Sequence, residues 1–231
     1  MNFAEFKKQV DLSKKALCQE VFAENRERIR IKKEATVVKN LEKIFSATLK
    51  ISNKKGFQAM SMRDLSRETG MSMGALYAYF PGKEELVAML QRQRRSVTQR
   101  IFEERIAAEP DPPKRLESAV RTHLYLSEAM QPWFYFSFME AKNLAAEEQE
   151  KAVLSERYTE GVFADILQDG QQLGAFRKID ARLLASIIKS MLQDWYLKRG
   201  KYARRNVSVD RYAEFILGFI RAYLEVKNPD P

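Results

Sequence analysis

Residues 61–86 read SMRDLSRETGMSMGALYAYFPGKEEL, and this stretch decides how the chain folds. Ser61 and Asp64 have the spacing of a capping box, in which a serine hydroxyl accepts from a free backbone amide while the acidic side chain reaches back to the start of the helix. Gly70 then ends the helix, because glycine enters the left-handed conformation of a C-cap without steric cost. The stretch therefore begins with one short, capped helix.

A second helix follows after a tight turn. Ser72 is placed to cap its start, and Pro81-Gly82 ends it. Four apolar residues are spaced to pack the two helices together: Leu65, Met71, Leu76 and Phe80. Five other residues are left to face outward: Met73, Gly74, Ala75, Tyr77 and Tyr79. This pattern predicts a helix-turn-helix unit.

The flanking sequence supplies a third helix and a long connecting helix. Residues 36–55 carry an apolar stripe at helical spacing, and we expect this helix to pack behind the other two. Residues 83–108 continue as one long helix, which the proline-rich run 110–113 ends. We divide the chain into three parts: an N-terminal extension (1–34), a helix-turn-helix domain (35–82) and a helical C-terminal domain (83–231).

The composition favours an all-α protein with a basic N-terminal half. The chain has 231 residues, of which 45% are hydrophobic and 31% charged, with few glycines and prolines. Residues 1–105 hold 22 Lys and Arg against 13 Asp and Glu, whereas residues 106–231 hold 18 of each, so the whole formal charge of +9 lies in the first half. A basic face of this kind indicates a polyanion binder, with a membrane surface as the other explanation.

Other classes of protein fit the sequence poorly. No run of about 18 apolar residues is present and the N-terminus lacks the apolar segment of a secretory signal, so we expect no membrane span and no export. Cys18 is the single cysteine, which excludes an internal disulfide and favours the cytoplasm. One histidine and no Gly-rich phosphate loop leave no catalytic triad or metal set. We therefore expect no enzymatic activity, no metal and no cofactor.

The N-terminal extension contains an apolar pattern and a basic run. Apolar residues at near-helical spacing favour a helix that packs on the body or on a partner: Phe3, Phe6, Val10, Leu17 and Val21. Residues 26–33 are rich in Arg and Lys. This run is either an arm that follows phosphates or enters a minor groove, or a solvated helix face, and both explanations stay open.

The C-terminal domain reads as about five helices with a dense aromatic cluster. Five aromatic residues lie within residues 133–138, which suits an apolar ligand cavity as well as plain core packing. The candidate ligand contacts are Trp133, Phe134, Phe138, Phe163 and Trp195. The last two helices, residues 181–199 and 210–227, carry apolar stripes wider than one partner helix requires, which favours a four-helix interface between two subunits over an internal helix pair.

Residues 71–86 resemble the DNA-binding signature of the TetR family of one-component transcriptional repressors, in which Ser-x-Gly-x-Leu-Tyr-x-Tyr-Phe precedes a Lys-Glu-x-Leu helix start. The resemblance covers about residues 36–90, and the rest of the chain matches the family in length and helical pattern. It implies an all-α fold with an N-terminal helix-turn-helix DNA-binding domain. It also implies a C-terminal domain that binds an effector and forms a homodimer through the last two helices.

The resemblance assigns roles to residues of the helix-turn-helix, because a recognition helix places its N-terminal residues at base edges in a major groove. The residues nearest the bases are Met73, Gly74, Ala75 and Tyr77. The family's phosphate-contacting positions are Tyr79 and Lys83, and further phosphate candidates are Ser61, Arg63 and Ser72. Ala75 stands where many relatives have threonine, so we expect a methyl contact to thymine there rather than a hydrogen bond.

These observations predict a ligand-responsive repressor that binds a palindromic double-stranded DNA operator as a dimer. A hydrophobic or amphipathic effector would release it, with a fatty acyl-CoA as one candidate, typical of some relatives, and a drug-like aromatic as another. The alternative is a basic helical adaptor that binds nucleic acid or a membrane surface without effector control. Such an adaptor explains the charge but not the order of caps and turn between Ser61 and Lys83.

Overall fold

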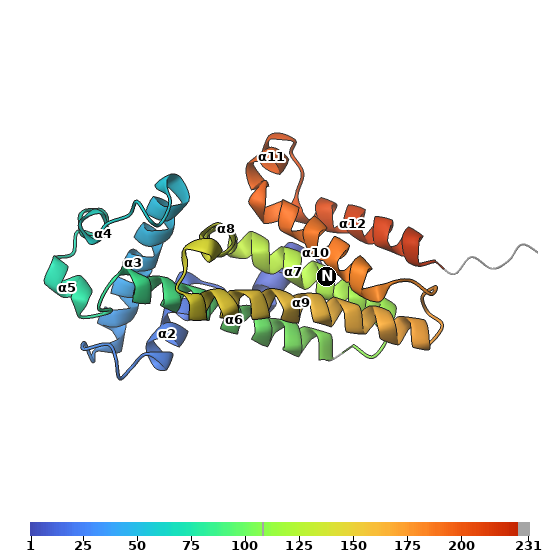
Figure 1. Ribbon diagram of the computed structural model, residues 1–231, viewed down its shortest axis with the longest axis horizontal. Coiled ribbons are helices and arrows are strands. Elements are labelled where there is room, and N and C mark those ends of the chain that lie inside the picture. The colour runs from blue at the N-terminus through green and yellow to red at the C-terminus, as the bar shows by residue number, and fades with distance from the viewer. Residues whose placement is uncertain (108, 226–231) are drawn as a thin grey trace, which may run out of the picture. The chain divides into compact units, whose positions relative to one another are not determined.

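The computed structural model describes residues 1–107 and 109–225, and every regular element in these ranges is a helix (Figure 1). The elements in chain order are α1 (Phe3–Gln9), α2 (Lys14–Glu24), α3 (Glu34–Lys55), α4 (Met62–Thr69), α5 (Met73–Tyr77), α6 (Lys83–Ala107), α7 (Pro112–Ala129), α8 (Gln131–Glu140), the 3-10 helix η1 (Ala141–Asn143), α9 (Ala146–Gln172), α10 (Ala181–Leu197), α11 (Arg199–Arg204) and α12 (Val209–Leu224). The predicted all-α class is confirmed for this part of the chain.

The chain forms two compact units. The head unit comprises Lys7–Val97 and Met130–Ala152. The body unit comprises Met1–Phe6, Thr98–Ala129 and Val153 to the end of the described chain. Helices α1, α6 and α9 each pass from one unit into the other.

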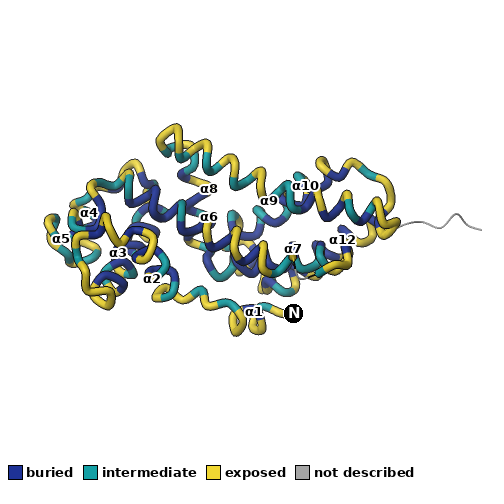
Figure 2. Tube along the Cα trace, turned by 90° about the horizontal axis from the view of Figure 1, so that it is seen from below, coloured by how far each residue is buried: buried dark blue, intermediate teal, exposed yellow. Residues whose placement is uncertain are grey.

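The core of the head unit is built on α3. The apolar stripe predicted for this helix is buried except at Ile51, which is half-buried. Its buried members are Val37, Leu41, Ile44, Phe45, Thr48 and Leu49. Helix α2 packs on α3, and Trp133 of α8 meets Phe45 edge-on, with ring centroids 5.5 Å apart. Each large apolar side chain buried in such a core contributes about 1.5–3 kcal/mol. Figure 2 shows the resulting pattern, in which buried and exposed stretches alternate along the helices.

Helix α2 brings the single cysteine into this core. Ser13 caps the helix by accepting from the amide of Ala16. Cys18 is buried, and burial raises the pKa of its thiol to about 12, with a smaller contribution from the carboxylate of Glu42. The thiol is therefore neutral and shielded at physiological pH.

The basic run of residues 26–33 is packed on the head unit. It is not helical, so that part of the explanation as a solvated helix face is wrong, although its charged side chains are exposed. Ile29 in its middle is fully buried, and the amide of Arg30 donates to the carbonyl of Ala78 across 3.1 Å. The guanidinium of Arg28 pairs with Glu85 at 3.2 Å. Contact of this run with DNA stays a prediction.

An aromatic cluster organises the body unit. Trp195 of α10 is fully buried, and its ring centroid lies 5.2 Å from that of Tyr202 and 5.0 Å from that of Tyr212. The indole Nε1 donates to a carboxylate oxygen of Glu128 at 3.0 Å. The cluster thereby joins α7, α10, α11 and α12.

The helix bounds differ from the predicted ones by a few residues. Helix α3 begins at Glu34 rather than at residue 36, and α10 ends at Leu197 rather than at residue 199. A separate short helix, α11, follows α10 and was not predicted. The predicted ends of the long helix and the final helix, at residues 108 and 227, lie outside the described residues.

Candidate functional site

The caps predicted for the helix-turn-helix are confirmed. The amide of Asp64 donates to Ser61 Oγ at 3.1 Å, and the amide of Ser61 donates to Asp64 Oδ2 at 3.0 Å, which completes a capping box. Gly70 ends α4 in the left-handed conformation, at φ 69°. Ser72 caps α5 by accepting from the amide of Ala75 at 3.2 Å. These local bonds satisfy backbone groups that the short helices leave unpaired.

A fixed carboxylate strengthens the first cap. Lys55 Nζ donates to Asp64 Oδ2 at 2.9 Å, and Arg67 pairs with the other oxygen at 2.5 Å. The hydrogen bond from Lys55, followed by those from Ser61, holds the pKa of the Asp64 carboxyl well below its usual range. The carboxylate is therefore ionised and in place at neutral pH.

The surface of α5 is small and weakly polar. Leu65, Leu76 and Phe80 are buried, as the packing prediction required, whereas Met71, the fourth predicted packing residue, is only half-buried. Met73 and Ala75 are half-buried, and Ser72, Gly74 and Tyr77 are exposed. Ser61 and Arg63 on α4 are exposed as well. The segment thus presents a glycine, short side chains and one tyrosine to a partner.

Tyr79 does not face outward, and that part of the prediction is wrong. Its side chain is buried, with an exposed fraction of 2%. Its hydroxyl accepts a hydrogen bond from Asn40 Nδ2 of α3 at 2.7 Å. Burial raises the pKa of this phenol, which keeps it protonated at neutral pH. Its role at a phosphate stays a prediction.

Lys83 lies at the start of α6 and holds the segment that precedes α4. Its ammonium donates to the carbonyls of Gln58, at 3.2 Å, and Met60, at 3.4 Å. It also lies 5.1 Å from the ring centroid of Phe57. The sequence did not reveal these contacts. An ammonium has three donors, so these two bonds leave one N–H for another acceptor. The contact of Lys83 with a phosphate stays a prediction.

The five predicted ligand contacts lie in different units. Trp133, Phe134 and Phe138 belong to the head unit, whereas Phe163 and Trp195 belong to the body unit. Phe134 is buried with the guanidinium of Arg94 lying 5.6 Å from its ring centroid, and Phe138 is 45% exposed. Phe163 meets the ring of Phe102 edge-on at 6.4 Å. These rings have packing partners inside the protein, and their contact with a ligand stays a prediction.

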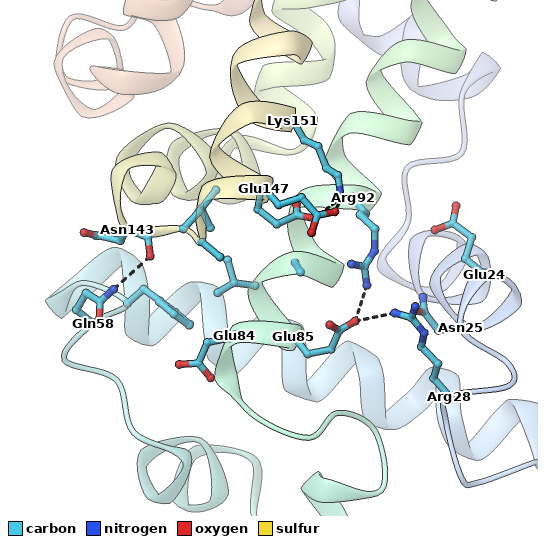
Figure 3. A pocket seen from close by; sticks show the side chains of 16 residues that line it. Glu24, Asn25, Arg28, Gln58, Glu84, Glu85, Arg92, Asn143, Glu147 and Lys151 are labelled. Carbon is cyan, nitrogen blue, oxygen red and sulfur yellow. Dashed lines mark hydrogen bonds and ion pairs between the residues drawn. The ribbon is translucent and has the colours of Figure 1, made fainter.

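A polar pocket of about 660 Å³ opens in the head unit (Figure 3). Its walls come from the end of α2, the start of α6 and the junction of η1 with α9. Glu85 accepts from Arg28, at 3.2 Å, and from Arg92, at 2.7 Å, on one side, and Gln58 donates to the carbonyl of Asn143 at 3.4 Å on the other. This lining is charged, unlike the aromatic cavity that the sequence suggested.

The described ranges hold no group of three or more His, Cys, Asp or Glu residues arranged to bind a metal ion. In the same part of the chain, the helices are all too short or too polar to cross a bilayer.

Two family profiles match the chain. Residues 44–90 match the family described as "Bacterial regulatory proteins, tetR family", and residues 109–220 match "Tetracyclin repressor-like, C-terminal domain". The HTH-type transcriptional repressor KstR of Rhodococcus jostii (strain RHA1) is 26% identical over 189 residues, which cover 77% of this chain and 82% of that protein.

Solved structures share the fold at low sequence identity. The regulator FadR from Bacillus subtilis, in complex with stearoyl-CoA, is 17% identical, with a TM-score of 0.60 over 79% of this chain and 98% of that one. AibR, in complex with isovaleryl coenzyme A and operator DNA, is 18% identical, with a TM-score of 0.63 over 76% of this chain and 95% of that one. At these identities the likeness establishes the architecture.

Proposed function

Because the chain belongs to the TetR family of transcriptional regulators, we propose that it is a dimeric repressor that binds a palindromic operator and releases it when an effector binds. The observation that carries this proposal is the capped α4–α5 segment. Its exposed residues lie in the half of the chain that holds the whole positive charge. An α5 presented in this way fits a major groove, whose width admits a helix.

The base contacts are few under this proposal. Gly74 and Ala75 lack side-chain donors and acceptors, so they offer close approach and a methyl group rather than hydrogen bonds. Tyr77 is 43% exposed and can reach a base edge or the backbone. Specificity then depends in part on sequence-dependent DNA shape, with Arg63 and backbone contacts fixing the position of the helix.

Asn40 positions the proposed phosphate donor Tyr79. Because the hydroxyl oxygen accepts from Asn40, the phenolic proton remains available for donation to a phosphate oxygen. The ring is buried, which restricts its rotation away from this position. The amide of Arg30 donates to the carbonyl of Ala78 in the same turn.

The proposed dimer surface lies on α10 and α12. Large apolar side chains are exposed on these two helices in the single chain: Leu183, Ile187, Phe215, Phe219 and Tyr223. Within each helix they recur four residues apart, so they share a face. An apolar face of this kind indicates a protein partner, and a second copy with the same face satisfies two-fold symmetry.

The proposed effector is an acyl-CoA. FadR and AibR, which share this fold, were each crystallised with one. Helix α6 begins directly after the helix-turn-helix and ends in the body unit. Its 25 residues give it a length of about 37 Å. Effector binding that shifts α6 would change the separation of the two α5 helices in a dimer. The affinity for the operator would then fall, because it depends on both helices binding together.

Selection of bound fragments from random DNA tests the proposed function. An inverted repeat with half-sites about one helical turn apart, or a multiple of it, is the expected result. Adding stearoyl-CoA or isovaleryl-CoA, with free CoA as the control, should release the selected fragment. A selected motif without two-fold symmetry, or no enrichment at low salt, would count against the repressor.

The role of Asn40 is tested by a double-mutant cycle with Tyr79. Tyr79→Phe should weaken binding to all sequences by a similar factor and leave the salt slope nearly unchanged, because the neutral phenol donates to a phosphate without neutralising its charge. Asn40→Ala should weaken binding in the wild type but add nothing on the Tyr79→Phe background. Asn53→Ala, on the same helix with its amide bound to the carbonyl of Pro132, is the matched control. Additive losses would show that Asn40 does not act through Tyr79.

A further inference from the structure

The segment between α3 and α4 determines where α4 begins. Gly56 ends α3 at φ 83°, and its amide donates to the carbonyl of Ser52 at 2.8 Å. A turn follows, in which the amide of Met60 donates to the carbonyl of Phe57 at 3.0 Å. Buried backbone groups outside helices need partners from other parts of the protein. The position of residues 57–60 therefore depends on their neighbours.

Glu140, the last residue of α8, supplies one of these partners. Its Oε1 accepts from the amide of Phe57 at 2.9 Å, and its Oε2 accepts from the side-chain amide of Asn143 at 2.7 Å. The glutamate is buried, with an exposed fraction of 5%. A backbone amide bound to a carboxylate makes a stronger hydrogen bond than one bound to a neutral acceptor. Both oxygens of Glu140 are thus engaged inside the head unit.

Other residues of α8 and η1 contact the same segment. The ring of Phe136 meets that of Phe57 edge-on, with centroids 6.1 Å apart. The side-chain amide of Gln58 donates to the carbonyl of Asn143 at 3.4 Å (Figure 3). All of these residues belong to the head unit, but α8 and η1 lie outside residues 44–90, which match the regulatory family profile. Support for the start of α4 thus comes from a part of the chain outside that profile.

We propose that Glu140 is a positioning residue for DNA binding. It holds the amide of Phe57, whereas Lys83 holds the carbonyls of Gln58 and Met60, so a carboxylate and an ammonium together fix the turn that precedes α4. A turn fixed in this way keeps the exposed residues of α4 and α5 in one orientation. The effect on DNA affinity rests on the proposed function, whereas the ordering of the turn does not.

Hydrogen exchange and DNA binding of the full chain test this role. Glu140→Met keeps an unbranched side chain of similar length but removes both carboxylate oxygens, which leaves the Phe57 amide buried without its acceptor. In the protein without DNA, amide exchange in residues 57–60 should become about tenfold faster. Affinity for the selected operator should fall about tenfold with an unchanged salt slope, because Glu140 neutralises no phosphate.

Glu140→Gln separates the hydrogen bond from the charge. Its amide oxygen can accept from Phe57, and the side chain of Asn143 can turn its own oxygen toward the new NH₂ group. This variant should therefore stay within about threefold of the wild type in both measurements. If Glu140→Met fails to fold, Glu140→Asp, whose carboxylate is one methylene shorter, should shift both measurements in the same direction.

The matched control is Glu148→Met. Glu148 is a carboxylate of the same unit, but it pairs with Arg95, at 2.9 Å, and with Lys151, at 3.1 Å. Its replacement should leave exchange in residues 57–60 and operator affinity unchanged.

Three results would overturn the positioning role. The first is unchanged exchange in residues 57–60 of Glu140→Met, and the second is faster exchange without a loss of affinity. The third is an equal effect in Glu148→Met, or no recovery in Glu140→Gln, because either would indicate general destabilisation. A wild-type protein that binds no duplex, with exchange as expected, would contradict the repressor and still support the ordering of the turn by Glu140.

Discussion

The α4–α5 segment and the α10–α12 segment both consist of helices joined by turns, but different forces hold them. Each of the first pair buries one side chain, Leu65 in α4 and Leu76 in α5, and depends on caps from Ser61 and Ser72. The second set buries a stack of aromatic rings around Trp195. One segment is therefore fixed by hydrogen bonds within a few residues, the other by contacts between distant helices.

This difference matches what each segment leaves exposed. The capped segment keeps small residues and one tyrosine at its surface, so a rigid partner can approach its backbone closely. The aromatic segment has a stable interior and can present large apolar side chains outward, such as Phe215, which is 74% exposed. Exposed apolar area on this scale is tolerated best where another protein surface covers it.

The largest effect is expected at the outward face of α12. Phe219→Glu places a charge in the proposed subunit contact, and loss of the dimer should reduce operator affinity by about 10²–10⁴-fold, since one half-site would bind alone. Sedimentation and DNA binding measure the two effects. Phe219→Leu, which keeps an apolar side chain, is the control. A Phe219→Glu protein that remains dimeric would show that this face of α12 does not form the subunit contact.

The interior of the aromatic segment gives the next largest effect. Trp195→Ala should lower the free energy of unfolding by about 3–5 kcal/mol, because it opens a cavity and removes the donor to Glu128. Tyr77→Ala in α5 is the matched control in the capped segment, and its exposed ring predicts a change within about 0.5 kcal/mol. Urea denaturation measures both. Similar losses in the two variants would show that the segments do not differ as described.

The smallest effect is expected at a cap. Ser72→Ala should cost about 1 kcal/mol, because the amide of Ala75 loses its acceptor. Ser190→Ala is the control, since this exposed hydroxyl bonds a carbonyl within its own helix and caps nothing. Hydrogen exchange should place the Ser72 effect in α5 alone. A rise in exchange that spreads through α3 would mean that the cap supports the whole domain.

The capped segment could be predicted from the sequence because its determinants are local. Ser61, Gly70 and Ser72 act on backbone groups within three residues, and such signals can be read directly. Tyr79 was misplaced because α5 ends at Tyr77, and the turn that follows directs the Tyr79 ring inward, where its hydroxyl meets Asn40 of α3. The sequence placed the end of this helix at Pro81-Gly82, and the earlier end at Tyr77 changes the direction of the following side chains.

The other features depend on contacts between distant residues. Asn40 lies 39 residues from Tyr79, and the walls of the polar pocket come from segments far apart in the chain. The bond between the amide of Phe3 and Asp210 spans almost the whole sequence. No periodic pattern encodes such pairings.

The burial of Cys18 has a practical consequence for measuring this protein. A neutral, shielded thiol reacts slowly with maleimide or methanethiosulfonate reagents, since the thiolate is the nucleophile. A cysteine introduced at an exposed position such as Arg63 would then take a spin label or a fluorophore selectively, with the native residue left in place. In a symmetric pair of subunits, the label-to-label distance would report on the spacing of the two α4–α5 segments in solution.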